Sequence, residues 1–191
     1  IPAFAKTFAI AFAQIDHPLL AADRILESGL SVESMEILDK TALDASLKKK
    51  TFIFPHTTRA LLIADITAET PEELEQAASR FEQICLDSYS IASEIETEEQ
   101  ERKKIWAIRK GAFPALAKIA PDIVLEESCV PRSMLTKAVK KTRDVLRTYR
   151  LNAGIIISPG PGSIQPHIAF DRRITQDLRR VKTVRGQLIK E

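Results

Sequence analysis

Two stretches of the chain carry polar side chains beside residues that disturb regular backbone. The first contains Arg109 and Lys110, shortly before Pro114, in a segment whose apolar spacing predicts a helix. An arginine there could bind a carboxylate, because the guanidinium fork matches two carboxylate oxygens. We expect the helix to kink or break between Gly111 and Pro114 and so to re-aim both basic side chains. On periodicity alone, a solvated or helix-capping Arg109 is the favoured interpretation.

The second stretch is a turn rich in glycine and proline, between Ser158 and Ser163. Pro161 lacks the amide that a phosphate-binding loop would need at this position, so a rigid hairpin turn is favoured. Beyond the turn, Gln165 and His167 fall on one face of a predicted strand, about 6.7 Å apart at the usual strand rise. They should line either a pocket or solvent, and a surface histidine is the simpler interpretation.

The remaining residues with chemical potential form no familiar site. Glu126 and Glu127 are adjacent in a predicted strand, point to opposite faces, and therefore cannot act as a carboxylate pair. The three histidines and two cysteines lack the spacings of a metal site. Cys85 and Cys129 lie in apolar patterns and are expected to be buried free thiols.

An α+β fold must position these residues. Strand patterns at 7–15, 32–38, 60–67 and 89–95, with helices at 18–29 and 71–84, predict a ferredoxin-like split βαβ core over about 7–96. We expect an antiparallel sheet with helices on one face. A second strand and helix unit extends it, with strands at 123–130, 154–157 and 164–170 and helices at 98–116, 133–149 and the basic C-terminal end. Capping boxes at Thr70 and Thr97 should start two helices.

Composition excludes several classes of protein. An apolar fraction of 45%, a charged fraction of 28% and a net charge of +2 are typical of a globular domain and exclude disorder. The cations at 172, 173, 179, 180, 182 and 185 are interpreted as a solvated helix face rather than a phosphate patch. No apolar run reaches the roughly 20 residues that cross a bilayer, so a cytoplasmic location is expected. Because the chain begins at Ile1, we expect a fragment.

Two runs together resemble a known family. They are Ile105-Trp106-Ala107-Ile108-Arg109-Lys110-Gly111-Ala112-Phe113-Pro114-Ala115-Leu116 and Pro121-Asp122-Ile123-Val124-Leu125-Glu126-Glu127-Ser128-Cys129-Val130-Pro131-Arg132-Ser133. They are similar to the C-terminal domain of FAD-linked oxidases, in the family that includes glycolate oxidase and D-lactate dehydrogenase. The resemblance extends from Thr7 to Asp171, so residues 1–191 would form one such domain, without the family's C-terminal tail.

That resemblance implies a function. An N-terminal FAD-binding domain of the same chain would hold the flavin, and this domain would supply much of the pocket for a small 2-hydroxyacid. An electron-transfer subunit is a possible further partner. The fragment alone should be inactive and free of flavin, with neither a nucleic-acid partner nor a membrane span.

The resemblance also assigns candidate residues. Arg109 falls where an arginine can meet the substrate carboxylate, and Glu127 falls where many relatives carry an aspartate near the pocket. The candidate substrate-binding residues are Arg109, Lys110, Glu127, Ser158, Ser163, Gln165 and His167. Catalytic and cofactor-binding residues are left unassigned.

The glycine-rich loop departs from the family pattern. Ser158 and Gln165 stand where metal-dependent relatives carry histidines, and neither replaces imidazole well on zinc, so we expect no zinc site. The altered loop supports an alternative, a degenerate non-catalytic binding or scaffold domain of the same fold. A free-standing ferredoxin-like effector-binding domain is a second alternative.

Overall fold

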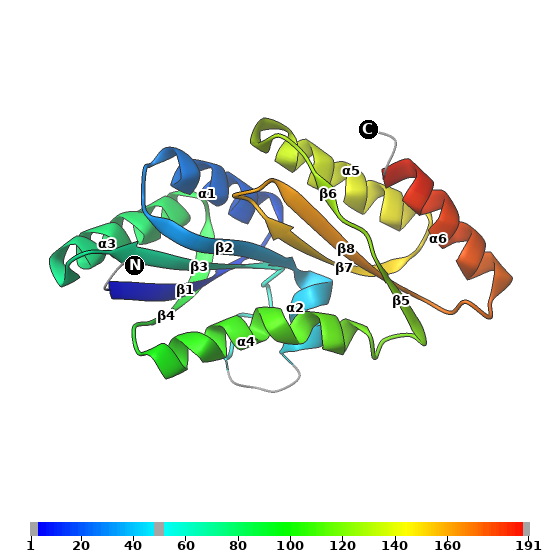
Figure 1. Cartoon of the computed structure of the whole chain (residues 1–191), viewed down its shortest axis with the longest axis horizontal. Helices are drawn as coiled ribbons and strands as arrows, with labels where there is room; N and C mark the ends of the chain where they lie inside the picture. The colour runs from blue at the N-terminus through cyan, green and yellow to red at the C-terminus, as the bar shows by residue number, and fades with distance from the viewer. Residues whose placement is uncertain (1–3, 48–51, 189–191) are drawn as a thin grey trace.

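The computed structural model describes residues 4–47 and 52–188, which form one eight-stranded antiparallel sheet with helices on both faces (Figure 1). The strands are β1 Phe4–Phe12, β2 Val32–Asp39, β3 Ala60–Ala68, β4 Ser90–Glu96, β5 Asp122–Leu125, β6 Ser128–Cys129, β7 Asn152–Ser158 and β8 Ser163–Phe170. The helices are α1 Asp16–Glu27, α2 Lys40–Ser46, α3 Pro71–Asp87, α4 Glu99–Leu116, α5 Leu135–Thr148 and α6 Thr175–Leu188, with a 3₁₀ turn at Arg132–Met134.

The first four strands have the predicted ferredoxin-like arrangement. Their order in the sheet is β4-β1-β3-β2, with every neighbouring pair antiparallel. The capping box at Thr70 is confirmed: its hydroxyl accepts the Glu73 N–H, and the Glu73 carboxylate accepts the Thr70 N–H. The box predicted at Thr97 is wrong, because α4 begins after Glu98 without a side-chain cap.

Helices cover the two faces of the sheet unequally. The helices α1 and α3 of the ferredoxin-like core lie on one face as expected, and α5 and α6 continue that layer over the second unit (Figure 1). The opposite face is covered by α4 and by the short α2, which the sequence did not lead us to expect. The prediction of helices on one face is therefore correct for the helices of the ferredoxin-like core and wrong for the whole chain, which has helices on both faces. Residues along each strand alternate between the two apolar clusters.

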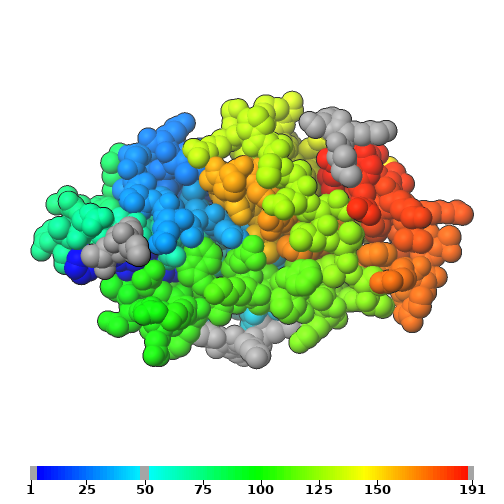
Figure 2. All heavy atoms as spheres, in the orientation of Figure 1, coloured from blue at the N-terminus to red at the C-terminus, as the bar shows by residue number. Residues whose placement is uncertain are grey.

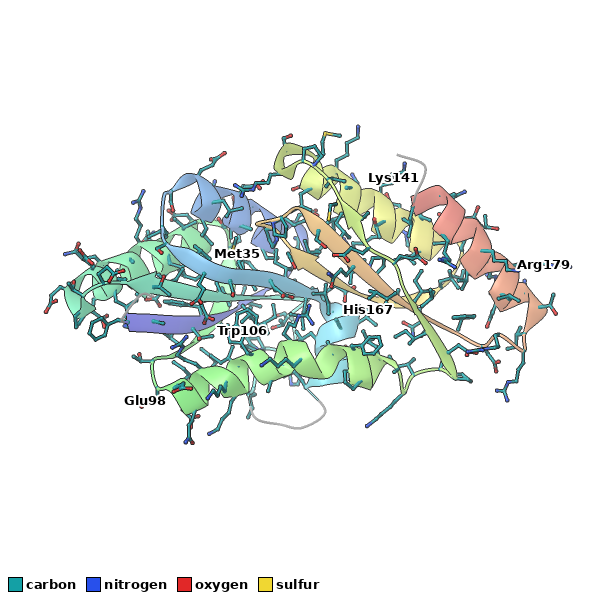
Figure 3. The ribbon with its side chains drawn as sticks, in the orientation of Figure 1. Met35, Glu98, Trp106, Lys141, His167 and Arg179 are labelled. Atoms are coloured by element: carbon teal, nitrogen blue, oxygen red, sulfur yellow. The ribbon has the colours of Figure 1, made fainter. Side chains whose placement is uncertain are left out.

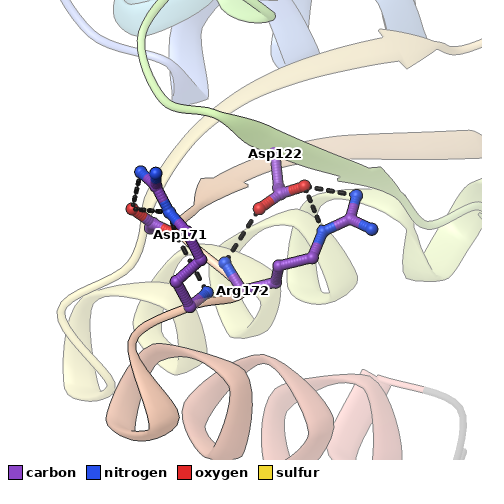
Figure 4. A network of polar contacts seen from close by, with 4 residues as sticks. Asp122, Asp171 and Arg172 are labelled. Carbon is purple, nitrogen blue, oxygen red and sulfur yellow. Dashed lines mark hydrogen bonds and ion pairs between the residues drawn. The ribbon is translucent and has the colours of Figure 1, made fainter.

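The second unit joins the core through a short seam. Only Ile37 with Ile157 and Leu38 with Ile156 pair between β2 and β7, and the sheet then continues through β8 to β5 and β6. The single strand predicted over 123–130 is wrong, because it divides into β5 and β6, both paired with β8. At the far end of the unit, Asp122 accepts hydrogen bonds from the backbone and side chain of Arg172 (Figure 4).

Two local predictions need correction. The helix α4 is not broken before Pro114, which lies inside it two residues before its last residue, so that only a short end of the helix follows the proline. Cys85 is buried as predicted, but Cys129 is exposed, because β6 lies at the margin of the sheet.

Candidate functional site

The helix α4 turns a polar stripe towards the sheet beside its apolar face. Arg102, Trp106 and Arg109 follow one another at helical spacing, so their side chains point the same way. The Arg102 Nε donates to Thr7 Oγ1 at 3.0 Å, and the Trp106 Nε1 donates to Asp65 Oδ2 at 2.9 Å. Thr7 Oγ1 also donates to Asp65, so this network secures the first half of α4 over β1 and β3.

Arg109 belongs to the same stripe but has a different strand as its partner. Its Nε donates to Glu36 Oε2 at 2.6 Å. The side chain of Arg109 is 28% exposed and that of Glu36 is 21% exposed. Glu36 lies on the α4 face of β2, because its neighbours Met35 and Ile37 belong to the opposite apolar cluster. Arg109 therefore points inward because of its helical phase, without a break at Pro114.

His167 lies next to this ion pair and is buried, not on the surface. Only 3% of the residue is exposed, and its ring lies 5.5 Å from that of Phe113. Figure 3 shows His167 on the side of the sheet that α4 covers, whereas Lys141 lies on the opposite side. Burial, and then the positive charge of Arg109, lower the pKa of His167, so the ring is neutral at neutral pH. Its Nδ1 has no hydrogen-bond partner among the described residues.

Three other candidates form a second polar group on the same face. The Glu127 Oε1 accepts hydrogen bonds from Ser163 Oγ at 2.8 Å and from Gln165 Nε2 at 2.9 Å. These bonds, from Gln165 first and then Ser163, lower the pKa of Glu127 and keep it ionised. Gln165 and His167 are two residues apart on β8. The Glu127 group therefore lies next to the group that contains His167 and Arg109. Glu126 points to the other face and forms an ion pair with Arg185 of α6.

Ser158 and Lys110 lie at the margin of this arrangement. Ser158 is paired with Ser163 in the β7–β8 hairpin and, with Glu36, lines a shallow pocket of about 240 Å³. Figure 2 shows atoms of this hairpin, in orange, at the surface beside the blue atoms of α1 and β2. Lys110 is exposed on α4 and makes no hydrogen bond or ion pair with a described residue.

The structure therefore places Arg109 beside His167, and Glu127 with Ser163 and Gln165 further along β8. Ser158 is paired with Ser163, and Lys110 lies outside both groups. Glu36 was not among the residues predicted from the sequence. A polar residue between two apolar ones in a strand was the available signal, but its partner lies 73 residues away. The described residues contain no group of three histidine, cysteine, aspartate or glutamate side chains able to hold a metal. The Glu127 oxygen beside Gln165 is also occupied by two hydrogen-bond donors.

Comparison with known sequences shows the family to which this chain belongs. A family model described as "FAD linked oxidases, C-terminal domain" matches residues 1–191. Glycolate oxidase subunit GlcD of Escherichia coli (strain K12) is 24% identical over 191 residues, which cover 98% of this chain and 38% of that protein. GlcD of Bacillus subtilis (strain 168) is also 24% identical, over 100% of this chain and 40% of its own length. A probable mitochondrial D-lactate dehydrogenase of Danio rerio is 21% identical, over 93% of this chain and 35% of its own length.

Solved structures share the fold. An alkyldihydroxyacetonephosphate synthase aligns with a TM-score of 0.65 and 13% identity, over 98% of this chain and 40% of its own. A p-cresol methylhydroxylase with substrate bound aligns with a TM-score of 0.62 and 15% identity, over 98% of this chain and 43% of its own. At these identities the likeness concerns the fold alone. Among the described residues, no helix combines the length and apolar character needed to cross a bilayer.

Proposed function

The chain belongs to the family of FAD linked oxidase C-terminal domains, and we propose that it forms the substrate-side domain of a flavoenzyme that oxidises a small 2-hydroxyacid. The chain spans 35% to 40% of the length of the relatives it matches, so the flavin would be held by another part of the protein. The relatives named glycolate oxidase and D-lactate dehydrogenase support glycolate or D-lactate as the substrate type.

The observation that carries the proposal is the way Glu36 holds Arg109. Their hydrogen bond uses the arginine Nε, and the described residues provide no hydrogen bond to either Nη. An arginine has five N–H donors, so four remain to bind a carboxylate. Glu36 therefore acts as a positioning residue that orients the guanidinium of Arg109 and leaves its Nη donors available. The Glu36 carboxylate offsets part of the charge of Arg109, so a substrate carboxylate would be held mainly by the remaining N–H donors.

The neighbouring groups suit the rest of the substrate. FAD, when bound, accepts the hydride, so this chain has to orient the acid and receive the hydroxyl hydrogen bond. Glu127, which is kept ionised, has Oε2 free of bonds to described residues and can accept a hydrogen bond from the substrate hydroxyl. The Nδ1 of the neutral His167 also lacks a described partner, but it is buried and is not exposed to a substrate in this structure. Phe113 and Leu125, 43% and 49% exposed beside His167, offer apolar surface for a flavin ring.

The first test uses the visible spectrum of the full-length protein. Addition of glycolate, D-lactate or D-2-hydroxyglutarate without oxygen should bleach the flavin bands with one of these acids. A protein without flavin would contradict the family-based proposal. Flavin that no acid bleaches would favour the second candidate, a non-catalytic binding domain, which the loss of both loop histidines supports.

A matched pair of variants then tests the arginine. Arg109→Ala should raise KM for the hydroxyacid about tenfold or more, because it removes a charge-assisted, two-pronged hydrogen bond. Lys103→Ala removes one positive charge from the exposed side of the same helix and should leave KM unchanged. Glu36→Gln should raise KM less than Arg109→Ala. Equal KM values for Arg109→Ala and Lys103→Ala would remove Arg109 from the binding site.

A further inference from the structure

The two parts of the chain carry opposite charges despite the small net charge. Residues 1–131 contain fourteen lysines and arginines against twenty-two aspartates and glutamates, a net charge of −8. Residues 132–188 contain thirteen against three, a net charge of +10. A field of this size draws anions towards the α5 and α6 layer.

A cavity opens where this basic layer meets the ferredoxin-like core. It has a volume of about 680 Å³ and lies where β1 and β2 end and β3 and β7 begin. That is the opposite end of the strands from Ser158 and Ser163, so the cavity is separate from the proposed substrate site. Its volume is within the range of small-molecule sites.

Cations from distant parts of the sequence converge on this cavity. Arg59 comes from the segment before β3, whereas Lys140 and Arg143 lie one turn apart on α5. None of these three side chains forms a hydrogen bond or ion pair with a described residue. Two other cations at the cavity are already neutralised, since Lys40 pairs with Asp44 and Arg147 with Asp144. Three cations at the cavity are therefore without a hydrogen-bonded or ion-paired partner among the described residues.

Two carboxylates in the wall of the cavity oppose these cations, the exposed Asp16 and the partly buried Asp39. Asp39 caps α2 by accepting the Ala42 N–H at 2.9 Å, and burial raises its pKa to about 6 despite bonds from backbone amides and the charge of Arg143. The proposed substrate site makes no use of this residue. It would repel an anion in the cavity, so its removal should strengthen anion binding.

We propose that this cavity binds a small anion with at least two negative charges, of the phosphate-bearing class, gripped by Arg59, Lys140 and Arg143. Guanidinium and ammonium groups on both sides of the opening match tetrahedral oxyanions. Ile15, Leu151 and Ile155 line the cavity beside them and would contact an organic part of the ligand. This proposal does not depend on the oxidoreductase activity.

Isothermal titration calorimetry of the full-length protein at fixed ionic strength tests the proposal, with inorganic pyrophosphate as the first probe. One equivalent should bind saturably. Arg143→Ala should weaken binding about tenfold or more, and Asp39→Asn, which keeps an oxygen to cap α2, should tighten it. Arg179→Ala is the matched control, because it removes an exposed cation from α6 far from the cavity (Figure 3).

The outcomes separate a site from general electrostatic attraction. Loss of binding in Arg143→Ala with wild-type affinity in Arg179→Ala supports the site. Equal weakening in both variants, or no saturable binding of pyrophosphate and ADP, overturns it. If the site exists, tighter binding of ADP than of pyrophosphate identifies a nucleotide, and the reverse identifies an inorganic or sugar-type phosphate.

Discussion

Gly162 provides the sharpest test of how the β7–β8 turn is built. Its φ is +71°, and a Cβ added there would lie 2.1 Å from the carbonyl oxygen of Val130. The backbone of Val130 also donates to the Gly162 oxygen at 3.0 Å, so the two segments cannot separate without losing a hydrogen bond. Gly162→Ala therefore meets both backbone strain and a clash with a backbone atom.

The expected cost follows from these two effects. A left-handed conformation costs a non-glycine residue about 1–2 kcal/mol, and overpacking costs about 1–3 kcal/mol. Gly162→Ala should therefore lower the free energy of unfolding by about 2–5 kcal/mol. Gly160 is a matched control in the same turn, because a Cβ there meets nothing within 4 Å and its φ is not positive. Gly160→Ala should be neutral or stabilise by up to about 1 kcal/mol.

Urea unfolding followed by far-ultraviolet circular dichroism measures both variants. The Gly162→Ala midpoint should fall without a change in the slope of free energy against urea, and the Gly160→Ala midpoint should stay or rise. Equal midpoints for the two variants would refute the close approach of this turn to β6. Ser163 follows directly, so Gly162→Ala should also disturb its hydrogen bond to Glu127.

Three further predictions concern capping, thiol reactivity and pH. Thr70→Ala should cost about 0.5–2 kcal/mol in urea unfolding, whereas Thr97→Ala, which removes no cap, should cost less than about 0.5 kcal/mol; equal costs would contradict the assignment of the caps. Ellman's reagent should titrate Cys129 in the folded protein but not Cys85, whose pKa is raised by burial to about 12, and two reactive thiols before unfolding would disprove this. Because burial lowers the pKa of His167, its unfolded state binds a proton first, so the free energy of unfolding should fall as pH drops below about 6.5. This fall should be smaller in His167→Gln, and an unchanged slope would show that the histidine does not contribute.

The ferredoxin-like core could be predicted because its signals are local. Alternating strands and a capping box at Thr70 each act within a few residues, and their order is sufficient to name the topology. The short α2 was missed because seven residues are too few for a clear helical period, although Asp39 as its N-cap was a usable signal. Pro114 misled because its effect depends on its distance from the helix end, which the sequence does not mark.

The candidate site was less accessible because its contacts are remote in sequence. The motif selected Arg109, Glu127 and Gln165, but the Glu36 partner of the arginine appears only when β2 is placed under α4. The burial of His167 likewise depends on Phe113 closing over it from a helix more than fifty residues earlier. Local pattern therefore predicted which residues to consider, and tertiary packing determined their charge state and orientation.

The short seam between β2 and β7 gives the chain a natural axis of deformation. Two residue pairs join the strands there, with Glu36 and its arginine on one side and His167, Gln165 and Ser163 on the other. A small change of twist at the seam would move the carboxylate-binding arginine relative to the groups on β8. The same twist would alter the cavity at the other end of the strands, whose cations also come from both sides of the seam. The distance between the two halves of the substrate site therefore depends on the twist at this seam, which two residue pairs and the apolar clusters shared by both halves hold in place.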